Sequence, residues 1–373
     1  MTTQPPQLAW SSAYQFISQL EAMQRQSPKA IDNIVTELEP IFIDGHAYPL
    51  TRNEKEYRNS YVCSPYTAYV HYAKDELGLL NSKALQWSLK GVIAILSGLL
   101  KLGRINQTVS VNNWLFSTNI MPDWDAKTIK HLTDKLINAN PLYSLSIRSL
   151  NHETDGELIQ RLKKTGWLML PARQVYLFMP EGHPDGHWWK RNNVKNDQRL
   201  LRNTSLTLVT PQQHQAQDFV EIERIFKQLF IDKHSIYNPQ MSAEYFEMLH
   251  RLKLVEFFSF RDDEERIVAS IGLFTQHGVI TAPIVGYDTE LPKSLGLYRL
   301  LMAQLLKITK ERNLPLNLSS GAGHFKRQRG GTPVIEYTAL YIRHLPILQR
   351  SIQWGFTALL NRFAAGFLQK HQL

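Results

Sequence analysis

The densest group of residues that could do chemistry lies in segment 316–341, LNLSSGAGHFKRQRGGTPVIEYTALY. It combines glycines with three cations and with hydroxyl and imidazole groups. Glycines let the main chain approach a ligand closely, and neighbouring cations can hold a phosphate or a developing oxyanion. An exposed basic turn shaped by glycine has the same composition, so both interpretations stay open. The candidate catalytic group here is Lys326, and the candidate substrate-binding residues are Ser319, Ser320, His324, Phe325 and Arg329.

Glu336 stands out because the strand pattern around it is otherwise apolar. Alternation places it on one face with Val334, Thr338 and Leu340. A carboxylate in a half-buried strand needs a partner. One interpretation is a salt bridge, to Lys326 or Arg329. The other is a catalytic general base or a group that orients an amine.

A second group lies in segment 286–299, GYDTELPKSLGLYR. Tyr287 and Asp288 precede a predicted helix, and Tyr298 and Arg299 lie on its first turns. A helix N-terminus favours anions, so these four residues are candidate substrate-binding groups. A capping turn with ordinary surface charges explains the same pattern. Asp288 could hold an acceptor amine.

Two further segments are polar or basic without a specific motif. Segment 187–202 carries five cations against one acid and begins next to two tryptophans. It is either a nucleic-acid surface or a solvated helix face with its aromatic residues in the core. Segment 111–119, VNNWLFSTN, is polar at a predicted strand end, where sites often lie, and a structural turn explains it equally well.

Bulk properties narrow the class of protein. A chain of 373 residues predicts about two domains, and a net charge of +9 allows an anionic partner. The single cysteine, Cys63, excludes a disulfide framework and fits a reducing compartment. The start of the chain does not resemble a secretory signal, the apolar run 91–100 is about half a membrane span, and the histidines show no metal spacing. We therefore expect a cytoplasmic protein with no metal site and no stable membrane insertion.

The elements that must position these residues follow from hydrophobic period. Residues 1–60 lack a clean period and contain prolines that include Pro40 and Pro49, so they predict short helices and loops. Residues 66–102 predict two helices. Helices and strands then alternate. The turn-rich segment 180–187, PEGHPDGH, indicates a boundary between domains 1–182 and 183–373. The second domain is predicted to have a basic helix, three central strands, a strong helix over 294–310, two more strands and a terminal helix. This order predicts an α+β or α/β fold with mixed, mostly antiparallel sheets flanked by helices.

The second half resembles the Fem-like, peptidyl- or aminoacyl-transferase-like branch of the GNAT acyltransferase superfamily. The resemblance rests on the basic helix 188–202, the helix 295–310 after the central strands, and a Gly-x-x-x-(aromatic)-Lys-x-x-x-Gly element. That element is matched by 321–330 with Phe325 and Lys326. The first half looks like a degenerate copy, which implies two tandem GNAT-like domains.

The resemblance implies transfer of an acyl or aminoacyl group to a small-molecule or peptide amine. Acyl-CoA, acyl carrier protein and aminoacyl-tRNA are the donors it implies, as cosubstrates rather than bound cofactors. Lys326 matches the family lysine near the donor carbonyl or phosphate. The loop that grips CoA in ordinary GNAT enzymes is reduced at 292–299 to Gly296, which favours a carrier-protein or tRNA donor. We expect Lys326→Ala to lower turnover about tenfold or more and to leave the fold intact.

Two rival hypotheses come from other classes of protein. A GNAT fold without a donor site could serve as a binding module for RNA or a protein partner through 186–202. Alternatively, the terminal helix 345–367 could anchor a peripheral membrane protein, because Trp354, Phe356 and Phe363 sit among few acids. Packing of that helix on the core is the simpler explanation.

Overall fold

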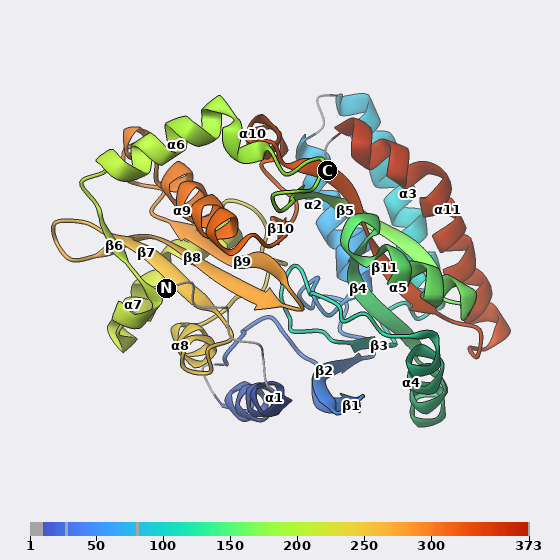
Figure 1. Ribbon diagram of the computed structural model, residues 1–373. Helices are drawn as coiled ribbons and strands as arrows, with labels where there is room; N and C mark the ends of the chain where they lie inside the picture. The colour runs from blue at the N-terminus through green and yellow to red at the C-terminus, as the bar shows by residue number, and fades with distance from the viewer. Residues whose placement is uncertain (1–9, 27–28, 80–81, 372–373) are drawn as a thin grey trace. The chain divides into compact units, whose positions relative to one another are not determined.

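The computed structural model describes residues 10–26, 29–79 and 82–371, which fold into two compact units (Figure 1). The units are interleaved along the chain. Unit 1 comprises Met1–Asp32, Val175–Ile236 and Gln240–Pro333, and unit 2 comprises Asn33–Gln174, Tyr237–Pro239 and Val334–Leu373. The expected division after residue 182 lies close to the passage from unit 2 into unit 1, but each unit also takes in chain from the other half.

Unit 1 is built on a sheet in the order β6-β7-β8-β9-β10-β5. Every neighbouring pair is antiparallel except β9 and β10, which are parallel. The strands are β6 (Thr207–Val209), β7 (Glu256–Arg261), β8 (Ile267–Gln276), β9 (Val279–Tyr287), β10 (Leu316–Asn317) and the end of β5 (Leu168–Phe178).

Helices cover both faces of this sheet. Helices α6 (Asn192–Asn203) and α9 (Leu297–Arg312) cover one face, and α7 (Ala216–Phe226) and α8 (Ala243–Arg251) cover the other (Figure 1). Strand β7 shows why, because its alternate aromatic side chains serve the two layers. Phe258 and Phe260 join the core under α9, whereas Phe257 packs against Phe219 and Phe246 of α7 and α8. Helix α1 (Trp10–Gln24) and the six-residue α10 (Gly323–Gln328) complete the unit.

Unit 2 contains the sheet order β1-β2-β3-β4-β11. Here β3 and β4 are the parallel pair. The strands are β1 (Glu37–Ile43), β2 (His46–Asn53), β3 (Thr108–Val111), β4 (Ser144–Asn151) and β11 (Thr332–Tyr341). The helices are α2 (Ala73–Glu76), α3 (Lys83–Leu102), α4 (Ala126–Ala139), α5 (His152–Lys164) and α11 (Ile347–His371). Of the helices in the described ranges, none has the length and apolar character needed to cross a membrane.

The two halves of the chain repeat one order of elements. In the first half the order is β3-α4-β4-α5-β5, and in the second it is β9-α9-β10-α10-β11. In both, the helix connects two parallel strands. The last strand of each repeat completes the other unit: the end of β5 pairs with β10, and β11 pairs with β4. This agrees with the predicted duplication and explains why neither unit is continuous in sequence.

The expectation of only helices and loops over residues 1–60 is wrong, because β1 and β2 form a hairpin there. Its turn is Asp44-Gly45, both with positive φ, which is the dipeptide that two-residue hairpins favour. Pro40 and Pro49, which argued against strands, lie opposite each other in the hairpin. Strand β1 is at the end of the sheet order in unit 2, where proline is tolerated.

Candidate active site

The parallel strands of unit 1 separate soon after they meet. Only two residue pairs join β9 to β10, Leu316 to Ile280 and Asn317 to Thr281. Strand β9 continues to Tyr287, whereas the chain after Asn317 turns to Tyr176 of β5, whose carbonyl accepts the Leu318 N–H at 2.9 Å. Beyond Thr281, β9 therefore has no strand on its β10 side among the described residues.

Main-chain donors of β9 face this separation. Asp288 donates its N–H to Val268 of β8 at 2.8 Å, so the ladder alternation directs the N–H groups of Val285 and Tyr287 to the opposite side. The register between β8 and β9 also shifts near Pro283, which is typical of a β-bulge. Thr281 marks the start of the separation, and its buried hydroxyl has no hydrogen-bond partner in the described residues.

Lys326 is held in place by hydrogen bonds to the main chain. Its ammonium group donates to the carbonyl oxygens of Leu318 (2.7 Å), Ser319 (3.3 Å) and Ser320 (2.8 Å), and the side chain is buried. An ammonium has three protons, so these contacts occupy all of them. As placed, Lys326 holds the turn that follows β10 and does not present its charge to a ligand. The basic segment predicted as a glycine-rich loop is thus partly the helix α10.

The turn held by Lys326 has an unusual backbone. Ser319, Gly321 and Ala322 all have positive φ, at 55°, 77° and 47°. Such a conformation is unfavourable for serine and alanine and persists only when the surroundings impose it. The three hydrogen bonds from Lys326 supply that constraint.

An aromatic cluster stands beside this turn. The ring of Tyr298, on the first turn of α9, lies 4.9 Å from Phe325 of α10 and 6.1 Å from Tyr287 at the end of β9. Burial, reinforced by Tyr287, raises the pKa of the Tyr298 phenol, so it stays protonated at neutral pH. Three of the predicted residues are therefore brought together from three separate segments.

Asp197 of the basic helix α6 joins two of the predicted arginines. It is buried and accepts from Nε of Arg299 at 2.8 Å and from Nε of Arg329 at 2.5 Å. Arg329 is itself buried and lies 3.3 Å from the centre of the Phe325 ring. The Arg299 side chain is 44% exposed, and its terminal nitrogens have no ion-pair partner in the described part of the chain. Arg299 is thus the cation that a ligand can reach.

Two predicted residues have other partners. Both oxygens of the Asp288 carboxylate accept hydrogen bonds, from Arg224 at 2.9 Å and from the N–H of Glu290 at 3.0 Å. His324 is exposed and contacts Gln328 within α10, at 2.8 Å.

The start of α9 has no side-chain cap. Gly296, which precedes this helix, needs to be glycine because its φ is 64° and a Cβ there would come within 3.0 Å of Leu200.

Glu336 belongs to unit 2 and pairs with Arg173, so its expected partners, Lys326 and Arg329, are wrong. The pair is bidentate, with N–O distances of 2.9 Å and 3.2 Å, and Arg173 also donates to the Ser117 carbonyl at 2.6 Å. Burial lowers the pKa of Arg173, but the charge of Glu336, the hydrogen bond to it and the nearby tyrosines together raise that pKa overall. Sequence reasoning missed Arg173 because β5 and β11 lie far apart in the chain.

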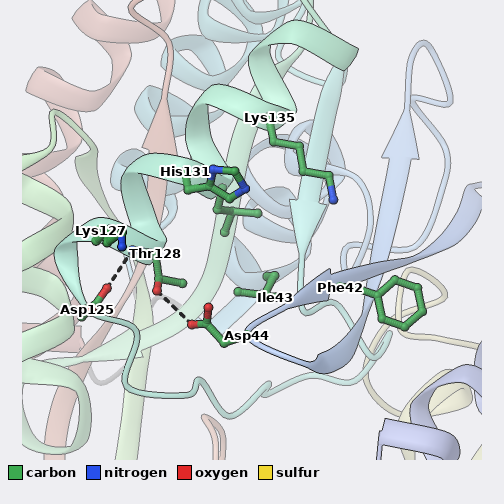
Figure 2. Close-up of a pocket in the computed structure, with 9 residues that line it drawn as sticks. Phe42, Ile43, Asp44, Asp125, Lys127, Thr128, His131 and Lys135 are labelled. Atoms are coloured by element: carbon green, nitrogen blue, oxygen red, sulfur yellow. Dashed lines mark hydrogen bonds between the residues drawn. The ribbon is translucent and has the colours of Figure 1, made fainter.

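A surface pocket of about 580 Å³ in unit 2 was not predicted (Figure 2). It lies between the β1–β2 turn and the start of α4, and it contains none of the predicted site residues. The Thr128 hydroxyl donates to the Asp44 carboxylate at 2.9 Å. The main-chain N–H of Thr128 donates to the carboxylate of Asp125, the N-cap of α4, at 2.7 Å. Two lysines and a histidine line it from α4, at helical spacing: Lys127, His131 and Lys135.

Comparison with known proteins shows which domain and which folds this chain is similar to. Residues 190–327 match the model of the acetyltransferase (GNAT) domain. The solved structure of FemX has a TM-score of 0.50 at 8% identity and aligns over 97% of this chain and 100% of FemX. The C-terminal domain of a putative lysylphosphatidylglycerol synthetase from Agrobacterium fabrum also has a TM-score of 0.50, at 10% identity, over 94% of this chain and 97% of that one. No curated protein matches the sequence.

These findings confirm the predicted fold class and a resemblance in fold to FemX, and the domain match supports the acyltransferase class of activity. The domain match spans the separation of β9 from β10, the start of α9 and most of α10. Residues 190–327 are similar to the acetyltransferase (GNAT) domain, in a chain whose fold is similar to that of FemX.

Proposed function

We propose that this chain transfers an acyl or aminoacyl group from an activated donor to an amine, at the separation of β9 from β10 in unit 1. The observation that carries the proposal is the match of residues 190–327 to a GNAT domain, because it covers the part of β9 that has no partner strand on one side. The nitrogen of the amine attacks the carbonyl carbon of the donor. An amide bond forms, the bond to the carrier sulfur or oxygen breaks, and the leaving group takes up the proton that the amine loses.

Main-chain N–H groups on the unpaired edge of β9 stabilise the negative charge that develops in this reaction. The N–H groups of Val285 and Tyr287 can donate to the oxygen of the attacked carbonyl, on which negative charge develops. Arg299 and the uncapped start of α9 favour an anionic part of the donor. Lys326 acts as a positioning residue that fixes the turn after β10.

Glu336 as the proton acceptor stays a prediction. Its carboxylate already accepts two hydrogen bonds from Arg173, so taking a proton would first require that pair to open. Attack by an amine that is already neutral needs no such group, and the amine then loses its proton to water or to the leaving group.

The surface of α6 favours a donor attached to an acidic carrier. Its one acid, Asp197, is turned inward to the arginines, and Trp188 before it is buried with its Nε1 donating to Met179 at 2.7 Å. The exposed cations repeat at helical spacing, in the order Arg191, Lys195, Arg199 and Arg202. Acyl carrier protein and aminoacyl-tRNA both present the negative charge that such a row would attract.

The test is amide formation, measured by mass spectrometry with acyl-CoA, acyl carrier protein and aminoacyl-tRNA donors and a panel of amines. A double charge reversal, Lys195→Glu with Arg199→Glu, should lower kcat/KM for the carrier-bound donor at least tenfold. A short thioester without a carrier should be used equally well by both proteins. The matched control is Lys127→Glu with Lys135→Glu on α4 in unit 2.

Failure of every donor with every acceptor would reject the proposal. Salt-sensitive RNA binding by the same protein would then favour a binding module.

A further inference from the structure

Helix α3 presents a wide apolar surface that the described residues do not cover. Trp87, Ile95 and Leu102 are 73%, 70% and 56% exposed, and they share one side of the helix because they are spaced by close to whole numbers of turns. Ile93 and Leu100 occupy the opposite side and are buried. The helix is therefore apolar on the side that faces the core and on the side that faces away from it.

Helix α11 has the same two-sided character. Phe356 is buried in the hydrophobic cluster that holds Ile93 and Leu100 of α3. Ile347 and Trp354 are 74% and 60% exposed on the opposite side of α11. Phe363, near the end of its described side chains, is 60% exposed.

The two helices form one layer of unit 2. They lie side by side in Figure 1, and Gln353 of α11 donates to the Gly103 carbonyl just after α3 at 2.9 Å. Because both bury one side in the same cluster, their opposite sides face away from the same core. We call this the α3–α11 surface, and its exposed apolar members are Trp87, Ile95, Leu102, Ile347 and Trp354.

The charges on this surface all have one sign. Neither α3 nor α11 contains an aspartate or a glutamate. Lys83 and Lys90 are exposed along one edge of the apolar side of α3, and Arg350 and Arg362 are exposed on α11. The ammonium of Lys90 lies 5.3 Å from the centre of the Trp87 ring. Apolar side chains and tryptophan bordered only by cations are complementary to the head groups and upper acyl region of an anionic bilayer.

We propose that the α3–α11 surface binds the face of an anionic phospholipid bilayer. A second copy of the chain is a poorer occupant, because self-association would bring cations against cations. Neither helix is long and apolar enough to span the bilayer, so the association is peripheral. The proposal does not depend on the transferase activity.

The experiment is flotation of the full chain with vesicles of phosphatidylcholine alone or mixed with phosphatidylglycerol. The expected result is flotation with the mixed vesicles, reduced by salt, and little with phosphatidylcholine alone. Trp87→Ser with Ile95→Ser should lower the vesicle partition coefficient by about tenfold or more, because both side chains lose their contact with the acyl region. Lys83→Gln with Lys90→Gln should lower it about tenfold for the mixed vesicles only.

The matched control is Val220→Ser with Ile236→Ser, which removes two apolar side chains that are 61% and 60% exposed in unit 1. It should float as the parent does. Circular dichroism and the unfolding midpoint establish that each variant is folded.

Three results would overturn the proposal. One is no flotation of the parent with mixed vesicles. Another is equal flotation of the parent and the Trp87→Ser, Ile95→Ser variant. The third is a concentration-dependent dimer, seen by sedimentation and abolished by the same substitutions, which would assign the surface to a second copy of the chain.

Discussion

The two parallel crossovers of this chain follow one plan and end differently. In unit 1 the strand after the helix, β10, has two residues, and β9 continues past it without a partner on that side among the described residues. In unit 2 the pairing of β3 with β4 runs over all four residues of β3, so β3 does not extend past its partner strand. One crossover leaves a strand edge available, and the other closes it.

The chain that follows β3 shows how unit 2 is closed. Asn112 and Asn113 are buried, and Asn112 accepts the indole N–H of Trp114 at 2.6 Å. Arg148 of β4 donates to the Val62 carbonyl at 2.7 Å and to the Asn113 side chain at 3.2 Å. Several polar groups at this strand end therefore bind one another. The same order of elements leaves an unpaired strand edge in unit 1, and in unit 2 it ends in a set of buried polar contacts.

The largest expected effect comes from removing the buried ion pair of unit 2. Arg173→Met leaves the Glu336 carboxylate buried without its partner, which should lower the free energy of unfolding by about 3–5 kcal/mol. Urea denaturation measures this. Adding Glu336→Met should recover most of the loss, since an apolar pair can replace a buried ion pair. A single variant as stable as the parent would contradict the structural role of the pair.

A substitution in the same pair tests whether unit 2 is only a scaffold or takes part in catalysis. Glu336→Gln should keep kcat within about threefold of the parent and leave the pH profile of kcat unchanged, if unit 2 is a scaffold. A general base removed from the reaction should instead lower kcat by about 100-fold or more and abolish the acidic limb of the profile.

The next effect concerns the turn after β10 in unit 1, which Lys326 holds. Lys326→Met leaves carbonyl oxygens of residues 318–320 without their donor and should cost about 1–3 kcal/mol of stability, with turnover about tenfold lower or worse. Denaturation and turnover, measured on the same samples, separate the two losses. This revises the expectation that the fold would be untouched. Lys307→Met on α9 is the matched control, because that lysine is 50% exposed; equal losses in both variants would remove the special role of Lys326.

A smaller effect should appear in binding alone. Arg299→Gln removes the reachable cation, while Asp197 keeps Arg329 as its partner. We expect KM for an anionic donor to rise by about tenfold with kcat nearly unchanged, because the contact is made equally before and during the reaction. Steady-state kinetics with a charged and an uncharged donor test this. An equal rise for both donors would show that the charge is not what matters.

The smallest effect is a pH dependence carried by unit 1. Burial lowers the pKa of His214, whose Nε2 lies 2.8 Å from the Ser259 hydroxyl. The unfolded chain therefore binds a proton below about pH 6.5 that the folded chain resists, so stability falls as the pH falls below that value. His214→Gln should flatten this fall in denaturation measured at neutral and mildly acidic pH. An unchanged slope would assign it to other groups.

The sequence predicted most of the elements because their hydrophobic period is strong, as in α4 and β8. It failed at the β1–β2 hairpin, where two prolines outweighed the Asp44-Gly45 turn signal. In the site it named Tyr298 in one group and Phe325 and Lys326 in another, and it could not assign their partners. The contacts of Lys326 with three carbonyls depend on positive φ at Ser319 and Ala322, which no residue type there indicates. The pair of Arg173 and Glu336 depends on strands far apart in the chain.

We propose above that the edge of β9 in unit 1 receives the acyl donor and that the end of β3 in unit 2 does not. Hydrogen–deuterium exchange, with and without the donor that gives amide product, distinguishes the two sites. We expect slower exchange in 282–288 and 318–329 when the donor is bound, and no change in 112–119. Protection of 112–119, with none in 282–288, would instead place the reaction in unit 2.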